Sequence, residues 1–131
     1  MGVGIRQLVE QAEKEIVTLS VKDAVAAVDD PDSVLVDIRD IREVQREGRI
    51  PGSFHAPRGL LEFWIDTESP YHKDIFSSGQ RYIFYCNRGW RSALATKTAQ
   101  DMGLKHVCHV EGGFEAWVGA DGPVEKVVQK K

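Results

Sequence analysis

The sequence is poor in cysteine, with only Cys86 and Cys108 among 131 residues. Two cysteines cannot build a disulfide framework, so the fold must be stabilised by a hydrophobic core, and a chain of this length can bury one. Few cysteines also fit a reducing compartment. We therefore predict that the protein is cytoplasmic.

Long apolar runs, a basic surplus and metal-ligand spacings are missing as well. No apolar run approaches the roughly 20 residues of a membrane helix, and the charged, amphipathic N-terminus does not resemble a secretory signal. The net charge of −3 gives no electrostatic attraction to nucleic acid or to a membrane surface. The four histidines show no zinc-ligand spacing with the cysteines. We expect no nucleic-acid, membrane or metal partner.

The sequence does contain an alternation of helical and strand-like segments. Helical spacing or capping residues mark the segments 5–15, 21–28, 41–48 and 90–103. Strand-like runs occupy 16–20, 33–38, 81–86 and 106–110, with a brief strand within 49–57. This alternation predicts a single α/β domain over residues 1–131 with a largely parallel sheet. Within it we expect an N-terminal helix (1–15), a core (16–119) and a C-terminal tail (120–131).

The exits of the predicted strands are the places to look for a site, because ligands of open parallel sheets bind outside the carboxyl ends of the strands. These exits are Asp37-Ile38-Arg39, Cys86 and Glu111-Gly112-Gly113. Cys86 begins the segment CNRGWRS, and the next helix starts about four residues later.

The turn after Cys86 has the features of an anion site. Backbone N–H groups between a strand and a helix converge into a nest, and the helix N-terminus adds free N–H groups and its dipole. Gly89 permits the positive φ of a tight turn, and Arg88 and Arg91 supply positive charge. Such a setting stabilises the thiolate, the reactive form of cysteine, and binds an anionic substrate beside it.

A simpler interpretation of a free cysteine is an inert core residue. It suits Cys108, in the middle of the strand 106–110, better than a role as a disulfide partner of Cys86. For Cys86, the compact loop with glycine and arginines favours a nucleophile. No histidine is placed by the sequence as a general base for Cys86, and a thiolate held by the loop would not need one.

The spacing between cysteine and arginine separates two kinds of anion site. Cysteine phosphatases use C-x5-R, in which the arginine and backbone groups surround a phosphate. Here Arg91 follows Cys86 by five residues, and Ser92 occupies the phosphatase position. The shorter ring is better suited to a single sulfur atom carried on the cysteine. A small phosphatase or arsenate reductase of similar fold remains an alternative.

Three motifs, taken in order, resemble the rhodanese family of single-domain sulfurtransferases. They are LVDIRDIREVQREGRIPGSFHAP (35–57), FYCNRGWRSALAT (84–96) and VEGGFEAW (110–117), and the match extends from about Ser20 to Trp117. The resemblance implies a rhodanese-like α/β domain with a central, largely parallel five-stranded sheet and helices on both faces.

The resemblance also implies an activity. Cys86 would take the outer sulfur of a donor such as thiosulfate and become a persulfide. The backbone N–H groups of residues 87–91 would hold that persulfide, until cyanide in the test tube or a thiol in the cell removed the sulfur. A protein could serve as donor or acceptor, and no metal or organic cofactor is implied. The substrate-binding residues would be Asn87, Arg88, Gly89, Trp90, Arg91 and Arg39.

Residues outside the loop receive narrower expectations. Arg39 matches the family arginine that helps to bind the anionic donor, whereas Asp37 and Glu43 match positions that are more often architectural and pair with arginines. Arg49 replaces the family histidine of Gly-His-Ile-Pro-Gly, in what we expect to be a surface turn. The segment 57–76 is longer than in minimal members and would form either a lid or simple packing on the sheet.

A third class of function is a module without enzymatic activity, for protein interaction or sulfur relay. Family domains that have lost activity often lack the cysteine, so the presence of Cys86 favours an enzyme.

Overall fold

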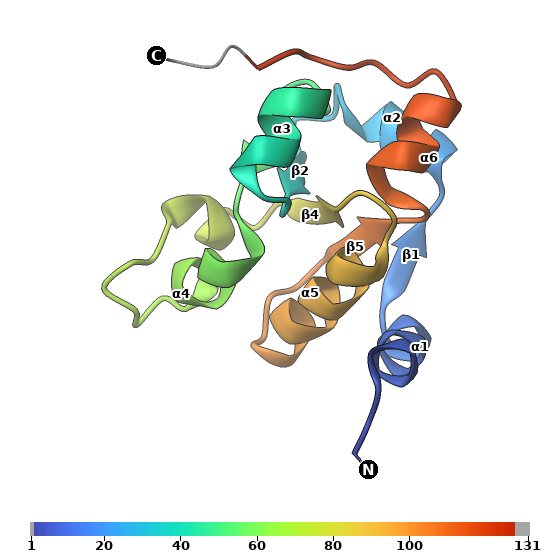
Figure 1. The fold of residues 1–131 in the computed structure, drawn as a ribbon. Coiled ribbons are helices and arrows are strands. Elements are labelled where there is room, and N and C mark those ends of the chain that lie inside the picture. The colour runs from blue at the N-terminus through green and yellow to red at the C-terminus, as the bar shows by residue number, and fades with distance from the viewer. Residues whose placement is uncertain (1, 128–131) are drawn as a thin grey trace.

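The computed structural model describes residues 2–127, which form an α/β fold in which helices and strands alternate along the chain (Figure 1). Its helices and strands are α1 (Ile5–Glu15), β1 (Val17–Leu19), α2 (Val21–Ala27), β2 (Ser33–Asp37), α3 (Ile41–Glu47), β3 (Phe54–His55), α4 (Leu61–Ile65), β4 (Arg81–Tyr85), α5 (Trp90–Asp101), β5 (Val107–Val110) and α6 (Gly113–Gly119). A 3₁₀ turn, η1 (Arg58–Leu60), directly precedes α4. A second, η2 (Asp74–Ser77), follows the loop after α4.

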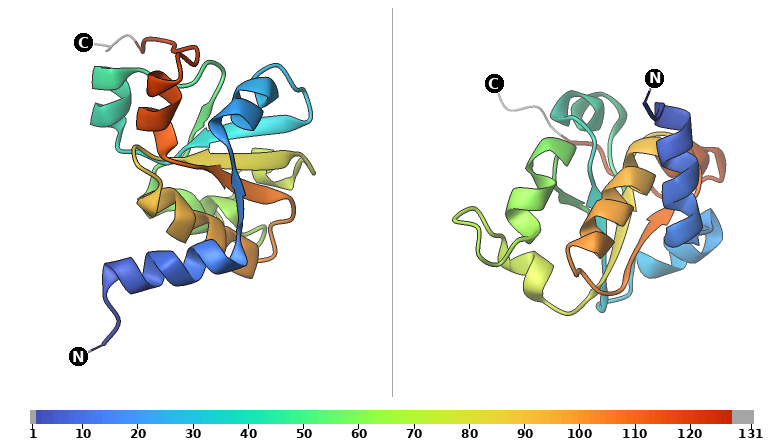
Figure 2. Two further views of the ribbon diagram at one scale, coloured as in Figure 1. Left: turned by 90° about the vertical axis from the view of Figure 1, so that its right-hand side faces the viewer. Right: turned by 90° about the horizontal axis from the view of Figure 1, so that it is seen from below.

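The five strands form one parallel sheet in the order β1-β5-β4-β2-β3, which confirms the predicted fold class. Helices α2, α3 and α6 lie on one face, and α1, α4 and α5 lie on the other (Figure 2). Because all strands run the same way, the carboxyl ends of β2, β4 and β5 lie together at one end of the sheet. Arg39, Cys86 and Glu111 follow these strand ends.

The pleat sorts the central strands between two hydrophobic clusters. Tyr82, Phe84 and Cys86 pack on the face of α4 and α5. Ile83 and Tyr85 pack on the opposite face, in a cluster that also contains Phe114 and Trp117 of α6. Successive side chains on a strand point to opposite faces, so this separation follows directly from the sequence spacing.

Small residues set how closely α5 approaches the sheet. Its buried side chains include Ala95, Thr96 and Ala99, while Trp90 and Met102 remain exposed. Helix α1 packs against α5, where Val9 and Ala12 meet Ala93 in a cluster of their own.

The segment after α6 returns to the far side of the domain. Figure 1 shows it running from α6 toward α3. Glu125 pairs with Arg49 in an antiparallel bridge, through backbone hydrogen bonds of 2.8 and 2.9 Å and an ion pair of 2.6 Å. Residues 128–131 of the expected C-terminal tail lie outside the described residues.

Candidate active site

The turn after β4 brings backbone N–H groups onto the sulfur of Cys86. The N–H of Gly89 donates to Cys86 Sγ at 3.1 Å, and the N–H of Ser92 donates at 3.4 Å. Gly89 has the positive φ expected from the sequence, 102°, and caps the start of α5. Only 1% of Cys86 is exposed. The turn therefore presents a buried sulfur with two amide donors directed at it.

Helix α6 fixes the start of this loop. The N–H groups of Phe114 and Glu115 donate to the carbonyls of Cys86 and Asn87, at 2.8 and 3.0 Å. Gly112 and Gly113 both have positive φ, and a Cβ on Gly113 would lie 2.5 Å from the Cys86 carbonyl oxygen. The third motif thus places its two glycines against the backbone of the cysteine loop.

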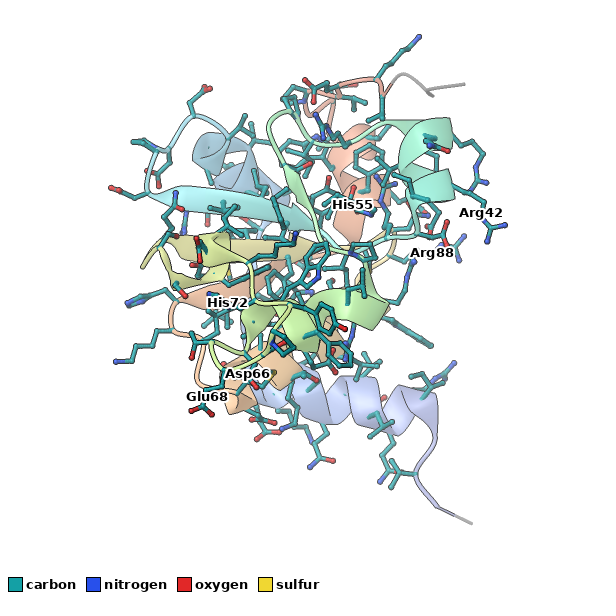
Figure 3. The ribbon with its side chains drawn as sticks, turned by 90° about the vertical axis from the view of Figure 1, so that its left-hand side faces the viewer. Arg42, His55, Asp66, Glu68, His72 and Arg88 are labelled. Atoms are coloured by element: carbon teal, nitrogen blue, oxygen red, sulfur yellow. The ribbon has the colours of Figure 1, made fainter. Side chains whose placement is uncertain are left out.

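A hollow of about 520 Å³ opens beside the sulfur. Among residues 2–127, its lining consists of Cys86, Asn87 and Arg88 from the turn after β4 and of Trp90 and Arg91 from the start of α5. Trp90 is half exposed. Arg88 lies at the outer edge of the molecule, on the side of Arg42 (Figure 3). The structure therefore gathers these five predicted residues around one cavity, with Gly89 in the turn behind it.

Both loop arginines are paired with carboxylates from neighbouring helices. Arg91 binds Glu43 of α3 through two hydrogen bonds of 2.7 and 2.9 Å, and Arg88 contacts Glu115 of α6 at 3.1 Å. The hydrogen bonds from Arg91 hold the pKa of Glu43 below its usual value. The charge beside the hollow is therefore partly compensated, which leaves the backbone N–H groups as the donors nearest the sulfur.

Arg39 does not reach the hollow, which contradicts its expected role in donor binding. The residue is fully buried, and its guanidinium binds Asp37 at 2.8 Å, the Gly48 carbonyl at 2.7 Å and Glu47 at 3.2 Å. It also lies 4.4 Å from the centre of the Phe114 ring. Every nitrogen of the group has a partner within the fold. Arg39 is a structural residue, and the pairing of Asp37 and Glu43 with arginines is confirmed.

Two polar side chains outside the predicted set of site residues, those of Ser92 and His109, contact the site. Ser92 Oγ lies 3.5 Å from Cys86 Sγ and 2.9 Å from Nδ1 of His109, and both residues are buried. Burial lowers the pKa of His109 to about 4, so its ring is neutral at pH 7. The strand pleat was the available signal, because His109 pairs in register with Phe84 and so shares its face of the sheet with Cys86.

Cys108 belongs to the opposite face. It pairs with Ile83 in register and packs in the cluster of α2 and α6, whereas Cys86 packs beside α5. Both cysteines are free, and burial raises the pKa of the Cys108 thiol. This position agrees with the interpretation of Cys108 as an inert core residue.

The segment 57–76 packs on the sheet beside α5. Leu61 and Ile65 are buried, and Trp64 packs edge-on against Phe54 with 6.0 Å between the ring centroids. Its outer part, marked by Asp66, Glu68 and His72 in Figure 3, lies across the molecule from Arg88. The packing interpretation is therefore the one that the structure supports.

Metal-binding clusters and membrane-spanning helices are both absent from residues 2–127. No group of three or more His, Cys, Asp or Glu side chains is arranged to hold a metal ion. No helix in this part of the chain is long and apolar enough to cross a membrane.

The family follows from a comparison with known sequences. A sequence model of the rhodanese-like domain matches residues 20–120. The chain belongs to the rhodanese-like family. This rhodanese-like domain is 32% identical over 100 residues to a mouse protein, "thiosulfate sulfurtransferase/rhodanese-like domain-containing protein 3", covering 72% of the chain and 64% of the mouse protein. It thus spans less than two thirds of that relative's length.

Two further relatives point in different directions. The thiosulfate sulfurtransferase GlpE of Glaesserella parasuis is 32% identical over 94 residues, which cover 72% of this chain and 79% of GlpE. A solved structure from Rhodopseudomonas palustris is 54% identical with a TM-score of 0.92, and the match covers 95% of this chain and 96% of that one. That protein is described as of unknown function and as a possible tyrosine phosphatase.

Proposed function

We propose that this rhodanese-like domain is a sulfurtransferase that carries a sulfane sulfur on Cys86. The observation that carries the proposal is the buried sulfur of Cys86, a residue that lines the hollow, with the N–H groups of Gly89 and Ser92 directed at that sulfur. The names of the mouse and Glaesserella relatives support the same reaction class.

In the proposed reaction the Cys86 thiolate attacks the outer sulfur of thiosulfate or of a persulfide donor. The S–S bond of the donor breaks, sulfite or a thiolate leaves with the bonding electron pair, and Cys86 becomes a persulfide. The acceptor then attacks the terminal sulfur, which breaks the new S–S bond and restores the thiolate. Cyanide would yield thiocyanate, and a thiol would yield a persulfide. Such a covalent intermediate divides the transfer into two displacement steps.

The loop would serve this reaction mainly through its backbone. The N–H groups of residues 87–91 would hold the terminal sulfur anion, since charge-assisted hydrogen bonds are stronger than neutral ones. Arg88 and Arg91 would attract an anionic donor, and Trp90 would form an apolar wall beside it. A protein partner would be accommodated equally well, because the hollow lies at the surface.

Intact-protein mass spectrometry after incubation with thiosulfate tests the proposal. We expect the gain of one sulfur atom in the wild-type chain and in Cys108→Ser, and no gain in Cys86→Ser. A second incubation with cyanide should remove the added mass and release thiocyanate. No gain in the wild-type chain with either thiosulfate or a low-molecular-weight persulfide would overturn the sulfurtransferase proposal. The protein-interaction module would then be the better account of the domain.

A phosphatase is the second candidate, because the Rhodopseudomonas structure is described as a possible one. The loop argues against it: Ser92, which stands at the phosphatase arginine position, turns inward to Cys86 Sγ and His109. The arginine one position earlier, Arg91, binds Glu43. Release of p-nitrophenol from p-nitrophenyl phosphate by the wild-type chain, and its loss in Cys86→Ser, would reverse this preference.

A further inference from the structure

A continuous hydrogen-bond chain leads from the buried sulfur to the exposed edge strand. Ser92 Oγ contacts Cys86 Sγ at 3.5 Å and His109 Nδ1 at 2.9 Å. On the other side of the ring, His109 Nε2 lies 3.2 Å from Oγ1 of Thr18, an exposed residue on β1.

The outer end of this chain has its own opening to solvent. A hollow of about 200 Å³ lies there, distinct from the larger hollow beside Cys86. Its lining includes Thr18, His109, Glu13 of α1 and Glu111. The loop residues Arg88 and Trp90 line both hollows and so form part of the wall between them.

We propose that Ser92, His109 and Thr18 form a proton path that carries the Cys86 thiol proton to solvent at β1 and leaves the Ser92 hydroxyl donating to the thiolate. It rests on the proposed role of Cys86 as a nucleophile. Ser92 and His109 are positioning residues in this scheme, since the bond to the transferred sulfur is made by Cys86 alone.

The proton movement balances without any further reactant. In the thiol form, Cys86 S–H donates to Ser92 Oγ, the Ser92 hydroxyl donates to His109 Nδ1, and the Nε2–H donates to Thr18 Oγ1. Each proton then moves one step outward, and Thr18 releases one proton to water. The result is a Cys86 thiolate that accepts from the Ser92 hydroxyl, which in turn accepts from Nδ1–H.

The histidine thus changes tautomer and never becomes charged. A neutral ring is what its surroundings favour, because burial lowers the pKa of His109 to about 4. A cation there would lack a carboxylate partner, since both ring nitrogens face hydroxyl groups. The ring can therefore pass a proton on but does not store one.

Several charged groups lie around the path. They are Glu13 from α1, Glu111 after β5, and the loop arginines with their carboxylate partners Glu43 and Glu115. None of these is a thiol or a histidine, the groups that ordinarily titrate near cysteine. A change of the His109 ring that coincides with ionisation of Cys86 is thus attributable to the path.

Nitrogen-15 NMR of the His109 ring in the wild-type chain tests the tautomer change directly. We expect the Nε2–H tautomer at low pH and the Nδ1–H tautomer at high pH, with the switch at the pH where Cys86 ionises. Thiolate absorbance near 240 nm, in a Cys108→Ala background, gives that pH. In Cys86→Ser the tautomer should stay fixed over the same range. One tautomer throughout in the wild-type chain, or a charged imidazolium at neutral pH, would overturn the proposal.

Alkylation of Cys86 by iodoacetamide gives a second, chemical readout. In the Cys108→Ala background, Ser92→Ala and His109→Leu should each move the pH midpoint of the alkylation rate upward by about one unit, a tenfold loss of thiolate below the midpoint. His106→Asn is the matched control. His106 has a positive φ that asparagine tolerates, lies before β5, and does not line either hollow, so its midpoint should not move.

A purely structural role would lower the midpoint of unfolding in these variants and leave the alkylation midpoint in place. Ser92→Ala is the smaller change of the two and the less disruptive to folding. An unchanged pH midpoint of alkylation in Ser92→Ala would contradict the proposal even if His109→Leu failed to fold. Neither readout uses a sulfur donor. A chain that shows the tautomer switch but gains no sulfur from thiosulfate would keep the proton path and lose the sulfurtransferase function.

Discussion

The exits of β2 and β4 are neighbours in the sheet, yet they use similar residue types in opposite ways. Asp37 pairs in register with Tyr85, so Arg39 and Cys86 follow adjacent strand ends. Arg39 binds Asp37, Glu47 and a carbonyl, and is fully buried. The Cys86 loop instead directs its N–H groups at a sulfur beside an open hollow.

The difference teaches how to recognise a site at a strand exit. A charged side chain there becomes structural when the chain itself supplies all of its partners. A binding site requires hydrogen-bond donors that are not already occupied by backbone or side-chain acceptors of the fold itself. In this domain the donors that meet that condition are mostly amides, which sequence motifs indicate through glycine and loop length and not through charge.

The largest expected effect is on the β2 exit, through Arg39→Met. Removal of the guanidinium leaves the Asp37 carboxylate buried without its partner, and such a loss costs about 3–5 kcal/mol. Urea unfolding measures the cost. The sulfur loaded per folded molecule should not change, because Arg39 does not reach the hollow.

Arg42→Met is the matched control for that change. Arg42 is an exposed arginine on α3 whose side chain is 83% exposed, so its substitution should alter stability by less than about 0.5 kcal/mol. Equal losses in the two variants would contradict the assignment of Arg39 as a buried structural residue.

An intermediate effect is expected at the β4 exit, through Gly89→Val. A β-branched residue at a φ of 102° is strained by about 1–3 kcal/mol. Relief of that strain would move the N–H of residue 89 away from Cys86 Sγ, so we expect slower loading from thiosulfate. Gly79→Val provides the comparison, because Gly79 also has positive φ but precedes β4 at the other end of the strand. Both variants should lose stability, and only Gly89→Val should lose loading rate.

Among the three site variants Arg39→Met, Gly89→Val and Arg91→Ala, the smallest effect on stability is expected for Arg91→Ala. Its ion pair with Glu43 is partly exposed, and such pairs contribute up to about 1 kcal/mol. Donor use should fall further, by about tenfold in kcat/KM, because the positive charge beside the hollow is lost. Arg88→Ala should have a weaker effect, since the Arg88 side chain is 80% exposed. Equal losses of stability and donor use in Arg91→Ala would count against a role in the anion site.

The Arg91 pair also predicts a pH dependence. The pKa of Glu43 is lowered in the folded chain, mainly by the hydrogen bonds from Arg91. A carboxyl group whose pKa is lowered by folding stabilises the folded chain at pH values above its pKa in the unfolded chain. That stabilisation is lost as the pH falls through the pKa of the folded chain. The stability difference between the wild-type chain and Arg91→Ala should therefore be present at pH 7 and vanish in acid.

Much of the architecture was predictable because it depends on periodicity and on turn residues. The alternation of elements, the parallel sheet and the positive φ of Gly89 each follow from local signals. Arg39 was misjudged because its role depends on Glu47 and the Gly48 carbonyl, which the fold of α3 brings to it. A family motif records that an arginine is present but not whether the chain encloses it.

His109 was missed for a related reason. Its contact with Ser92 joins two elements that are 17 residues apart, and neither residue belongs to a recognisable catalytic spacing. The pleat alone would have placed His109 on the Cys86 face, given the register of β4 with β5. That register depends on the tertiary pairing of the strands and is not readable from either strand by itself.

The bridge between Arg49 and Glu125 has a consequence for where the domain can be cut. Glu125 lies beyond residue 120, where the family match ends, yet its carbonyl is 2.9 Å from the position of a Cβ on Gly48. The Gly48 carbonyl, in turn, binds Arg39. The backbone at Glu125 therefore packs against Gly48, whose carbonyl binds the buried Arg39. We expect a chain that stops at residue 120 to be a poorer stand-in for the domain than one that continues past residue 125.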